Sequence, residues 1–306
     1  MIIPCYNVKE HVGAAVKSAL AQTHADLEIV VIDDGSTDGT AHVLEAIARE
    51  HGDRLSIVHQ QNQGACAARN AGVAATTGDW IQFLDADDRI APDKIERQLD
   101  LLRVDTDVVV GGYRNNFADG RAPVEVIPVE SDPWEALIRT RMGTTSANLF
   151  RRTALVNAGG WDASLRSSQD YDLLFRMLKK GAAIQWDPHV RCGVLKRNEG
   201  SISRTDEPEN WKRYLDLRCA IRDHLKTLDP IAHAATIAIA DQYLFMAIRV
   251  LSKHDRSAAR EAFQCMLPKG FIPEANAATT STYVRVFNLL GFNWAERIAS
   301  ARSLNR

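Results

Sequence analysis

The feature that most constrains the fold is an alternation of strand and helix patterns over the first hundred residues. Runs rich in β-branched residues at 27–33 (LEIVVID) and 55–60 (LSIVHQ) alternate with helical periodicity at 8–22, 40–51 and 65–75. Such an alternation implies right-handed crossovers and a parallel sheet covered by helices on both faces. We therefore predict an α/β fold with a mostly parallel sheet flanked by helices.

Beyond residue 107 the pattern changes twice. Strands and helices still mix up to about residue 203, and beyond it nearly every segment has helical periodicity. The apolar stretch that begins at Ile231 includes His233, Asp241 and Gln242, so we interpret it as a buried helix rather than a membrane span. We predict an α/β domain and a C-terminal helical region, with bounds 1–204 (halves 1–100 and 101–204) and 205–306.

Composition excludes several classes of protein. The chain has 37 Lys and Arg residues and 39 Asp and Glu residues, so its net charge is close to zero. It therefore lacks the positive surface potential that would attract nucleic acid. The five cysteines are far apart and form no CxxC pair, which argues against a disulfide framework or a zinc site and fits a reducing cytosol. No signal peptide is recognisable at Met1, so we expect a cytoplasmic protein.

Acidic residues follow two of the predicted strands. Asp33 ends LEIVVID, and Asp85 ends the run WIQFL, with Asp87 and Asp88 directly behind it. Ligands of parallel α/β sheets bind at the carboxyl ends of the strands, and burying this much negative charge without a partner would cost several kcal/mol, roughly. The spacing of Asp85 and Asp87 suits a shared Mg²⁺ or Mn²⁺ completed by substrate phosphates. For Asp88, capping of the next helix is an equally good explanation.

Two further segments fit a nucleotide. Tyr6 in PCYN offers an aromatic face on which a base could stack, and Asp33 could accept hydrogen bonds from a ring N–H. Arg69, just inside the helix of NQGACAARNAG, is suited to a phosphate or a base carbonyl. A solvated helix arginine would explain Arg69 equally well if the segment stood alone.

Four segments together closely resemble the motifs of family 2 glycosyltransferases of the GT-A fold. In chain order they are PCYN, VIDDGSTDGT, NQGACAARNAG and FLDADD. GGWDASLRSSQDYDLLFRMLKKG also resembles the family segment that carries an acidic pair before a helix. The resemblance covers roughly residues 1–204. It implies metal-dependent, inverting transfer of a sugar from a nucleotide diphosphate donor to an acceptor hydroxyl. In this family the nucleotide is usually UDP.

The resemblance also implies roles for individual residues. Asp170 falls at the place of the general base, which must take the proton of a weakly nucleophilic hydroxyl. Pro4 and Tyr6 would line the pocket of the base, and Asp33 would bond to the edge of the base with Arg69 nearby. Asp85 would face the ribose and the metal, and Asp87 would bind the metal.

Two positions depart from the family pattern. Gln169 replaces the first acid of the pair, which leaves a contact to the acceptor there in doubt. In VLKRNEGSISR, Lys196 and Asn198 replace Arg and His, so we expect no third protein ligand to the metal, while Lys196, Arg197 and Ser201 could still contact the diphosphate. We expect His189 to be a surface residue rather than a ligand.

The acceptor side is less clearly marked. An aromatic ring with polar groups suits a sugar, and Trp161, Asp162 and Tyr171 are the candidates near Asp170. The acceptor would be a saccharide or a lipid-linked saccharide of a cell-surface polysaccharide or glycolipid. The basic amphipathic stretch 293–306 could lie on the inner face of a membrane, although packing on its own domain or on a partner subunit is the interpretation we favour.

Three other classes compete with this interpretation. A sugar-phosphate nucleotidyltransferase would need a Gly-rich phosphate loop directly after the first strand, where this chain has PCYNVKE. A phospho-acceptor signalling domain would leave LDADD and SSQDYD unused. A non-catalytic nucleotide-sugar-binding protein is the third alternative, and the presence of Asp85, Asp87 and Asp170 argues against it.

Overall fold

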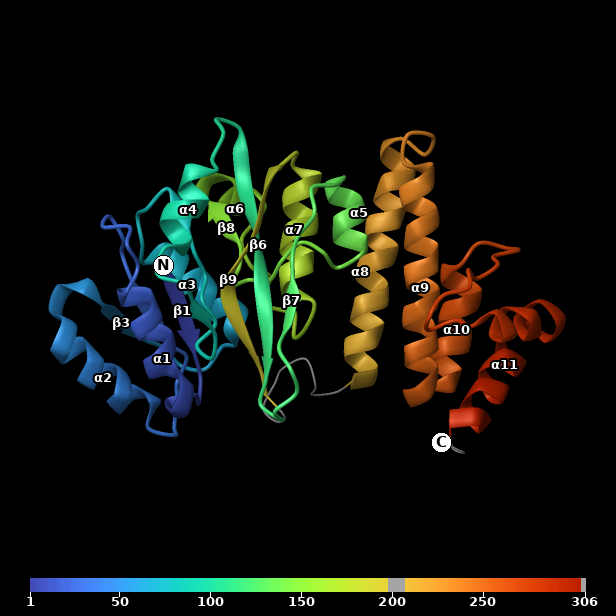
Figure 1. The fold of residues 1–306 in the computed structure, drawn as a ribbon, viewed down its shortest axis with the longest axis horizontal. Coiled ribbons are helices and arrows are strands. Elements are labelled where there is room, and N and C mark those ends of the chain that lie inside the picture. The colour runs from blue at the N-terminus through green and yellow to red at the C-terminus, as the bar shows by residue number, and fades with distance from the viewer. Residues whose placement is uncertain (198–206, 304–306) are drawn as a thin grey trace. The chain divides into compact units, whose positions relative to one another are not determined.

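The computed structural model describes residues 1–197 and 207–303, and the chain divides into two compact units, Met1–Ser201 and Ile202–Arg306 (Figure 1). The predicted boundary at 204/205 lies outside the described residues.

The first sheet of the N-terminal unit is parallel. Its strands are β1 (Ile2–Cys5), β2 (Val30–Asp33) and β3 (Ser56–His59), in that order. Ile2 also donates to the Gln82 carbonyl (2.8 Å) and accepts from the Leu84 amide (2.9 Å), which places residues 82–84 along the free side of β1. The carboxyl ends of these four segments therefore meet at one edge.

Helices cover this sheet as the apolar periodicity predicts. They are α1 (Lys9–Leu20), α2 (Thr40–His51), followed by the short 3₁₀ helix η1 (Gly52–Arg54), and α3 (Ala65–Ala74). Helix α3 packs on β1 and β2, and Gly72 is required there because a Cβ would lie 2.2 Å from the Ile2 side chain. This close approach brings Arg69 of α3 beside the ends of the strands.

The second sheet is mixed. It is built from β4 (Trp80–Ile81), β5 (Arg89–Ile90), β6 (Thr106–Phe117), β7 (Val124–Val126), β8 (Leu149–Arg151) and β9 (Ala183–Lys196). The order is β4-β8-β6-β9-β5, with β7 on β6; only β6 and β9 pair in parallel. The short loop between β6 and β7 suits an antiparallel hairpin, because a parallel pair needs a crossover of about a dozen residues.

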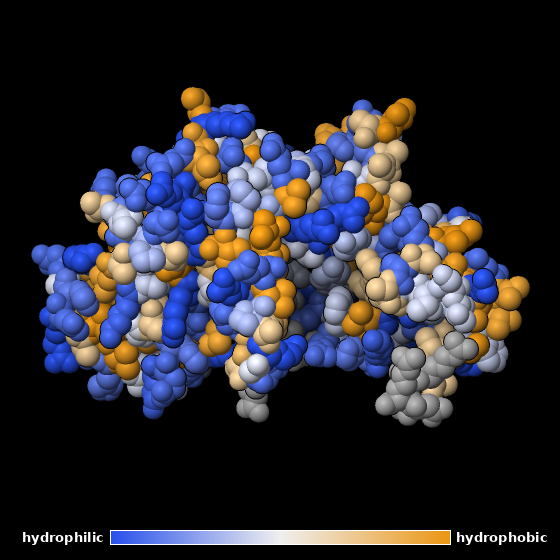
Figure 2. Space-filling view, in the orientation of Figure 1, coloured by the Kyte–Doolittle hydropathy of each residue, from blue (hydrophilic) through white to orange (hydrophobic). Residues whose placement is uncertain are grey.

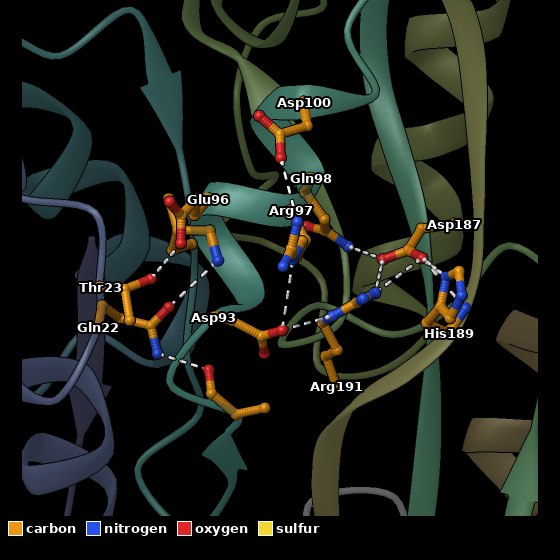
Figure 3. A network of polar contacts seen from close by, with 12 residues as sticks. Gln22, Thr23, Asp93, Glu96, Arg97, Gln98, Asp100, Asp187, His189 and Arg191 are labelled. Carbon is orange, nitrogen blue, oxygen red and sulfur yellow. Dashed lines mark hydrogen bonds and ion pairs between the residues drawn. The ribbon is translucent and has the colours of Figure 1, made fainter.

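Polar contacts tie helix α4 (Lys94–Asp100) to β9 (Figure 3). On β9, Arg191 Nη1 lies 3.2 Å from Asp187 Oδ1, and Arg191 Nε lies 3.5 Å from Asp93 Oδ2. The Gln98 side-chain amide donates to Asp187 Oδ2 at 3.3 Å. His189 lies 3.1 Å from the same carboxylate with a side chain 66% exposed, which fits the surface position that the sequence predicts. The remaining helices of this unit are α5 (Pro133–Ile138), α6 (Arg152–Asn157) and α7 (Gln169–Lys179).

The C-terminal unit is helical, as predicted. Its helices are α8 (Glu207–Leu228), α9 (Ala234–His254), α10 (Arg256–Met266) and α11 (Ser281–Ser303). Helix α9 has the length and apolar composition of a membrane span, yet Leu244, Phe245, Ile248 and Leu251 are buried in the core of the unit. Gly291, with φ of 76°, interrupts α11.

Candidate active site

Asp34, the second acid after β2, holds a loop. Its buried carboxylate accepts from the Gln60 side-chain amide (2.7 Å) and from the backbone amides of Gln63 (2.9 Å) and Gly64 (2.8 Å). These bonds fix the chain between β3 and α3, the helix that carries Arg69. Asp34 is therefore a structural residue.

Asp33 lies beside the His59 ring at the strand edge. The register aligns Cys5, Asp33 and His59 across β1, β2 and β3, and Tyr6, half-exposed, follows Cys5. Asp33 is buried, accepts from the Ser36 amide (3.1 Å) and lies 3.0 Å from His59 Nδ1. Sequence reasoning missed His59, although it follows a strand as Asp33 does.

Pro4, the other predicted base-pocket residue, is buried within β1, where it pairs with Ile32. Its ring is covered in this structure, so Tyr6 and not Pro4 presents an accessible ring at this edge.

The turn after residues 82–84 is held by Ser146, which sequence reasoning did not find. The Ser146 hydroxyl accepts from the Asp85 amide (3.0 Å) and donates to the Asp88 carboxylate (2.7 Å). The Leu195 amide of β9 also donates to Asp88, at 3.0 Å. Asp88 therefore pins the turn to β9, and it does not cap α4, which begins at Lys94.

Asp87 and Asp85 form an acidic pair in which each carboxylate contacts an arginine. Arg197 Nε lies 2.8 Å from Asp87 Oδ2. Burial and then the charge of Asp85 raise the pKa of Asp87, while Arg197 opposes the shift. Two carboxylates supply hard oxygen donors of the kind that Mg²⁺ or Mn²⁺ prefers, since such ions take one or two carboxylates and complete their shell with water and phosphate.

The described residues, 1–197 and 207–303, contain no cluster of three or more His, Cys, Asp or Glu side chains that could hold a metal. Ser201, expected near the diphosphate, lies outside the described residues.

Arg69 is a buried cation between the turn and helix α7. Its guanidinium donates to Asp85 (2.7 Å) and to the Gln169 side chain (3.2 Å), and its Nε has no hydrogen-bond partner among the described residues. Burial lowers the pKa of Arg69, but the carboxylates of Asp85 and Asp170 more than offset it, so the pKa is raised overall. Arg69 thus stays charged and joins the two acidic segments.

Asp170 lies in the first turn of α7, half-buried, and has no hydrogen-bond or ion-pair partner among the residues that the structure describes. Its charge contributes to the raised pKa values of Arg69 and, after burial, of Tyr113. Gln169 keeps a hydrogen bond to Arg69 where the family pattern would supply a charge. The structure thus brings Asp170 close to the turn of Asp85.

The acceptor candidates are only partly placed as expected. Trp161 is 2% exposed, with its ring edge-on to Phe83 and 4.5 Å from the Arg69 guanidinium carbon. Its face is covered, so Trp161 is a core residue here and not a platform for a sugar. Asp162 is exposed and closes a turn by accepting from Ser164, while Tyr171 is half-buried on α7.

Family comparison decides the class of the chain. The model of the family described as glycosyl transferase family 2 matches residues 1–160, more than half of the 306 residues. The chain belongs to glycosyl transferase family 2. This match confirms the resemblance drawn from the motifs.

Curated relatives support the same family. An uncharacterized glycosyltransferase of Rickettsia typhi is 33% identical over 229 residues, which cover 70% of each chain. An uncharacterized glycosyltransferase of Nostoc is 41% identical over 120 residues, 39% of this family 2 chain and 37% of the relative. The chain spans 34% to 38% of the length of the first curated relatives that it matches.

Solved structures show the same α/β fold. Residues 1–349 of Staphylococcus aureus TarS, in complex with UDP-GlcNAc, match with a TM-score of 0.62 at 18% identity over 88% of this chain and 75% of that fragment. The mannosyltransferase PcManGT of Pyrobaculum calidifontis, in complex with GDP-Man and Mn²⁺, matches with a TM-score of 0.57 at 18% identity. The match covers 99% of this chain and 83% of PcManGT. The fold is that of GT-A transferases, as the sequence predicts.

Proposed function

We propose that the protein is an inverting, metal-dependent glycosyltransferase that moves a sugar from a UDP-sugar to an acceptor hydroxyl. The observation that carries the proposal is the convergence of Asp85 and Asp170 on buried Arg69, with Asp87 beside Asp85. The TarS complex with UDP-GlcNAc supports a nucleotide-sugar donor, and UDP as the base follows the family habit.

The spacing of the strands supports a site for a nucleoside diphosphate at this edge. Asp33 ends β2, and Asp85 follows the segment on the far side of β1, so the backbones at these two strand ends are two strand spacings apart, about 10 Å. Tyr6 and Asp33 would receive the base and Asp85 the ribose. Arg69 would hold Asp85 and balance charge beneath the donor.

Asp85 and Asp87 would hold Mg²⁺ or Mn²⁺. A divalent ion stabilises the charge that develops on a departing diphosphate. Arg197, which pairs with Asp87 in this structure, would then be available to contact the diphosphate. The Mn²⁺ in the PcManGT complex supports this assignment.

Asp170 would be the general base. Its carboxylate has no partner among the described residues and can accept the proton of the acceptor hydroxyl as that oxygen attacks. Attack opposite the leaving group inverts the anomeric carbon in one displacement and needs no second carboxylate. Asp162 and Tyr171 remain the proposed acceptor contacts.

The proposal assigns donor binding to residues 1–100, acceptor binding and catalysis to 101–204, and an accessory role to the helical region 205–306. The acceptor would be a saccharide or lipid-linked saccharide of a cell-surface polysaccharide or glycolipid. All five cysteines are free thiols, which supports a cytoplasmic location.

We expect thermal unfolding to shift upward with UDP only when Mn²⁺ or Mg²⁺ is present, with GDP and dTDP as comparisons. Asp170→Asn should keep this shift and lose transfer by about 10²- to 10⁴-fold, the contribution of a general base. Asp172→Asn, on the same helix but paired with Arg176, is the control and should keep the rate. Transfer at a normal rate by Asp170→Asn, or no shift with any nucleotide, would contradict the proposal.

A further inference from the structure

Helix α11 exposes apolar residues next to its break. Around Gly291, Leu289 is 81%, Leu290 54% and Trp294 52% exposed, while Phe287 and Phe292 are buried in the core of the unit. We call Leu289, Leu290 and Trp294 the α11 patch. Figure 2 shows hydrophobic surface along the edge of this unit where α11 lies. The helix therefore packs on its own domain but leaves these three apolar side chains outside the core.

The break separates the two sets of side chains. Gly291 adopts a positive φ, so the helical phase before it does not continue after it. A cleft of about 210 Å³ opens there, lined by Leu290, Trp294 and the polar Arg260, among others. The patch is thus two apolar protrusions on either side of a shallow cleft.

Exposed arginines surround the patch. Arg260 lines the cleft, the Arg297 guanidinium lies 5.2 Å from the Trp294 ring, and Arg285 precedes Leu289 by one helical turn. Each of these side chains can extend its apolar stem along the patch and direct its charge outward.

The acids near the patch do not cancel this charge. Glu296 turns inward, where its carboxylate accepts from Arg249 (2.7 Å), Ser252 (2.8 Å) and the Tyr283 hydroxyl (2.7 Å). Glu261, next to Arg260 in sequence, is the exposed acid closest along the chain. The described surface around the patch is therefore basic.

We propose that the α11 patch docks on an anionic lipid bilayer. A tryptophan and leucines beside arginines are the combination that binds the interface of a membrane: the rings and leucines enter the acyl boundary, and the guanidinium groups bind lipid phosphates. A protein partner with an apolar surface would gain nothing from three arginines unless it were also acidic, whereas an anionic bilayer matches both properties. The inference does not depend on the transfer reaction.

The test is co-sedimentation of the full chain with vesicles of phosphatidylcholine, with or without phosphatidylglycerol. We expect binding only to the anionic vesicles, weakened by salt because the arginine contribution is screened. Leu289→Asp/Leu290→Asp and Arg260→Glu/Arg297→Glu should each lower the partition coefficient at least about tenfold. The matched control is Ile231→Asp, an 88%-exposed apolar residue of the same unit, which should bind normally.

A second readout reports on the patch itself. Quenching of tryptophan fluorescence by brominated lipid should occur in the wild type and fall in Trp294→Phe. All substituted side chains are exposed, so circular dichroism should show an unchanged fold. No binding to anionic vesicles, or normal binding by Leu289→Asp/Leu290→Asp, would overturn the proposal. Self-association that this variant abolishes, without vesicle binding, would do so too, because a second copy would then cover the patch.

Discussion

Ser146→Ala should destabilise the protein far more than the loss of one hydroxyl suggests. The Ser146 side chain is fully buried, accepts from the Asp85 amide and donates to the Asp88 carboxylate. Alanine leaves a buried N–H without a partner, at about 1–3 kcal/mol, and removes a hydrogen bond to a carboxylate, at about 1.5–3 kcal/mol. Asp88 keeps the Leu195 amide. Because Asp88 keeps that bond and the Asp85 amide is only part-buried, we expect a loss somewhat below the sum of the two contributions, about 2–5 kcal/mol in the free energy of unfolding.

Denaturant unfolding followed by circular dichroism measures this loss. Ser164→Ala is the control, because the Ser164 hydroxyl contacts Asp162 in an exposed turn, and it should change stability by less than about 1 kcal/mol. Adding Asp88→Ala to Ser146→Ala should cost less than the sum of the two single substitutions, since the two side chains share a bond. A Ser146→Ala protein within about 0.5 kcal/mol of the wild type would refute the reasoning.

Two further predictions concern buried and edge residues of the same unit. Burial lowers the pKa of Lys94 to about 7, so the unfolded chain holds the Lys94 proton more tightly than the folded protein. Relative to Lys94→Met, wild-type stability should therefore rise by about 1.4 kcal/mol per pH unit from pH 7 to pH 10, measured by urea unfolding; a flat difference would contradict this. His59→Ala removes the partner of Asp33 and should weaken UDP binding about tenfold by calorimetry while leaving pyrophosphate binding unchanged; equal losses for both would refute a base-side role.

The parts of the fold that the sequence predicts are those encoded by neighbouring residues. The β-branched runs that end in Asp33 and near Asp85 define strands and their carboxyl ends locally, and crossovers by helices then order the strands without further information. The shared edge of Tyr6, Asp33 and Asp85 follows from this logic. His59 could have been found in the same way, since it is the last residue of β3.

Contacts between distant residues could not be predicted in this way. Ser146 reaches Asp85 across 61 residues, and Leu195 reaches Asp88 across 107, so no local pattern announces either bond. The sequence left Trp161 open as an acceptor contact or a core residue for a related reason. An aromatic residue in a polar loop looks exposed in the sequence, but Phe83 and Arg69 bury it from two other segments.

The paired acids show how the two kinds of information combine. Two pairs of adjacent acids, Asp33–Asp34 and Asp87–Asp88, divide their roles in the same way. The carboxylate of the first acid lies at the candidate site, and that of the second accepts hydrogen bonds from backbone amides of a distant loop or strand. Asp33 and Asp34 continue the extended end of β2, where successive side chains point to opposite sides. Asp87 and Asp88 lie in a turn instead, which directs Asp87 to Arg197 and Asp88 to Ser146 and the Leu195 amide. In both pairs one carboxylate is thus left for chemistry and the other anchors a distant segment, and the anchor fixes the geometry on which the first depends.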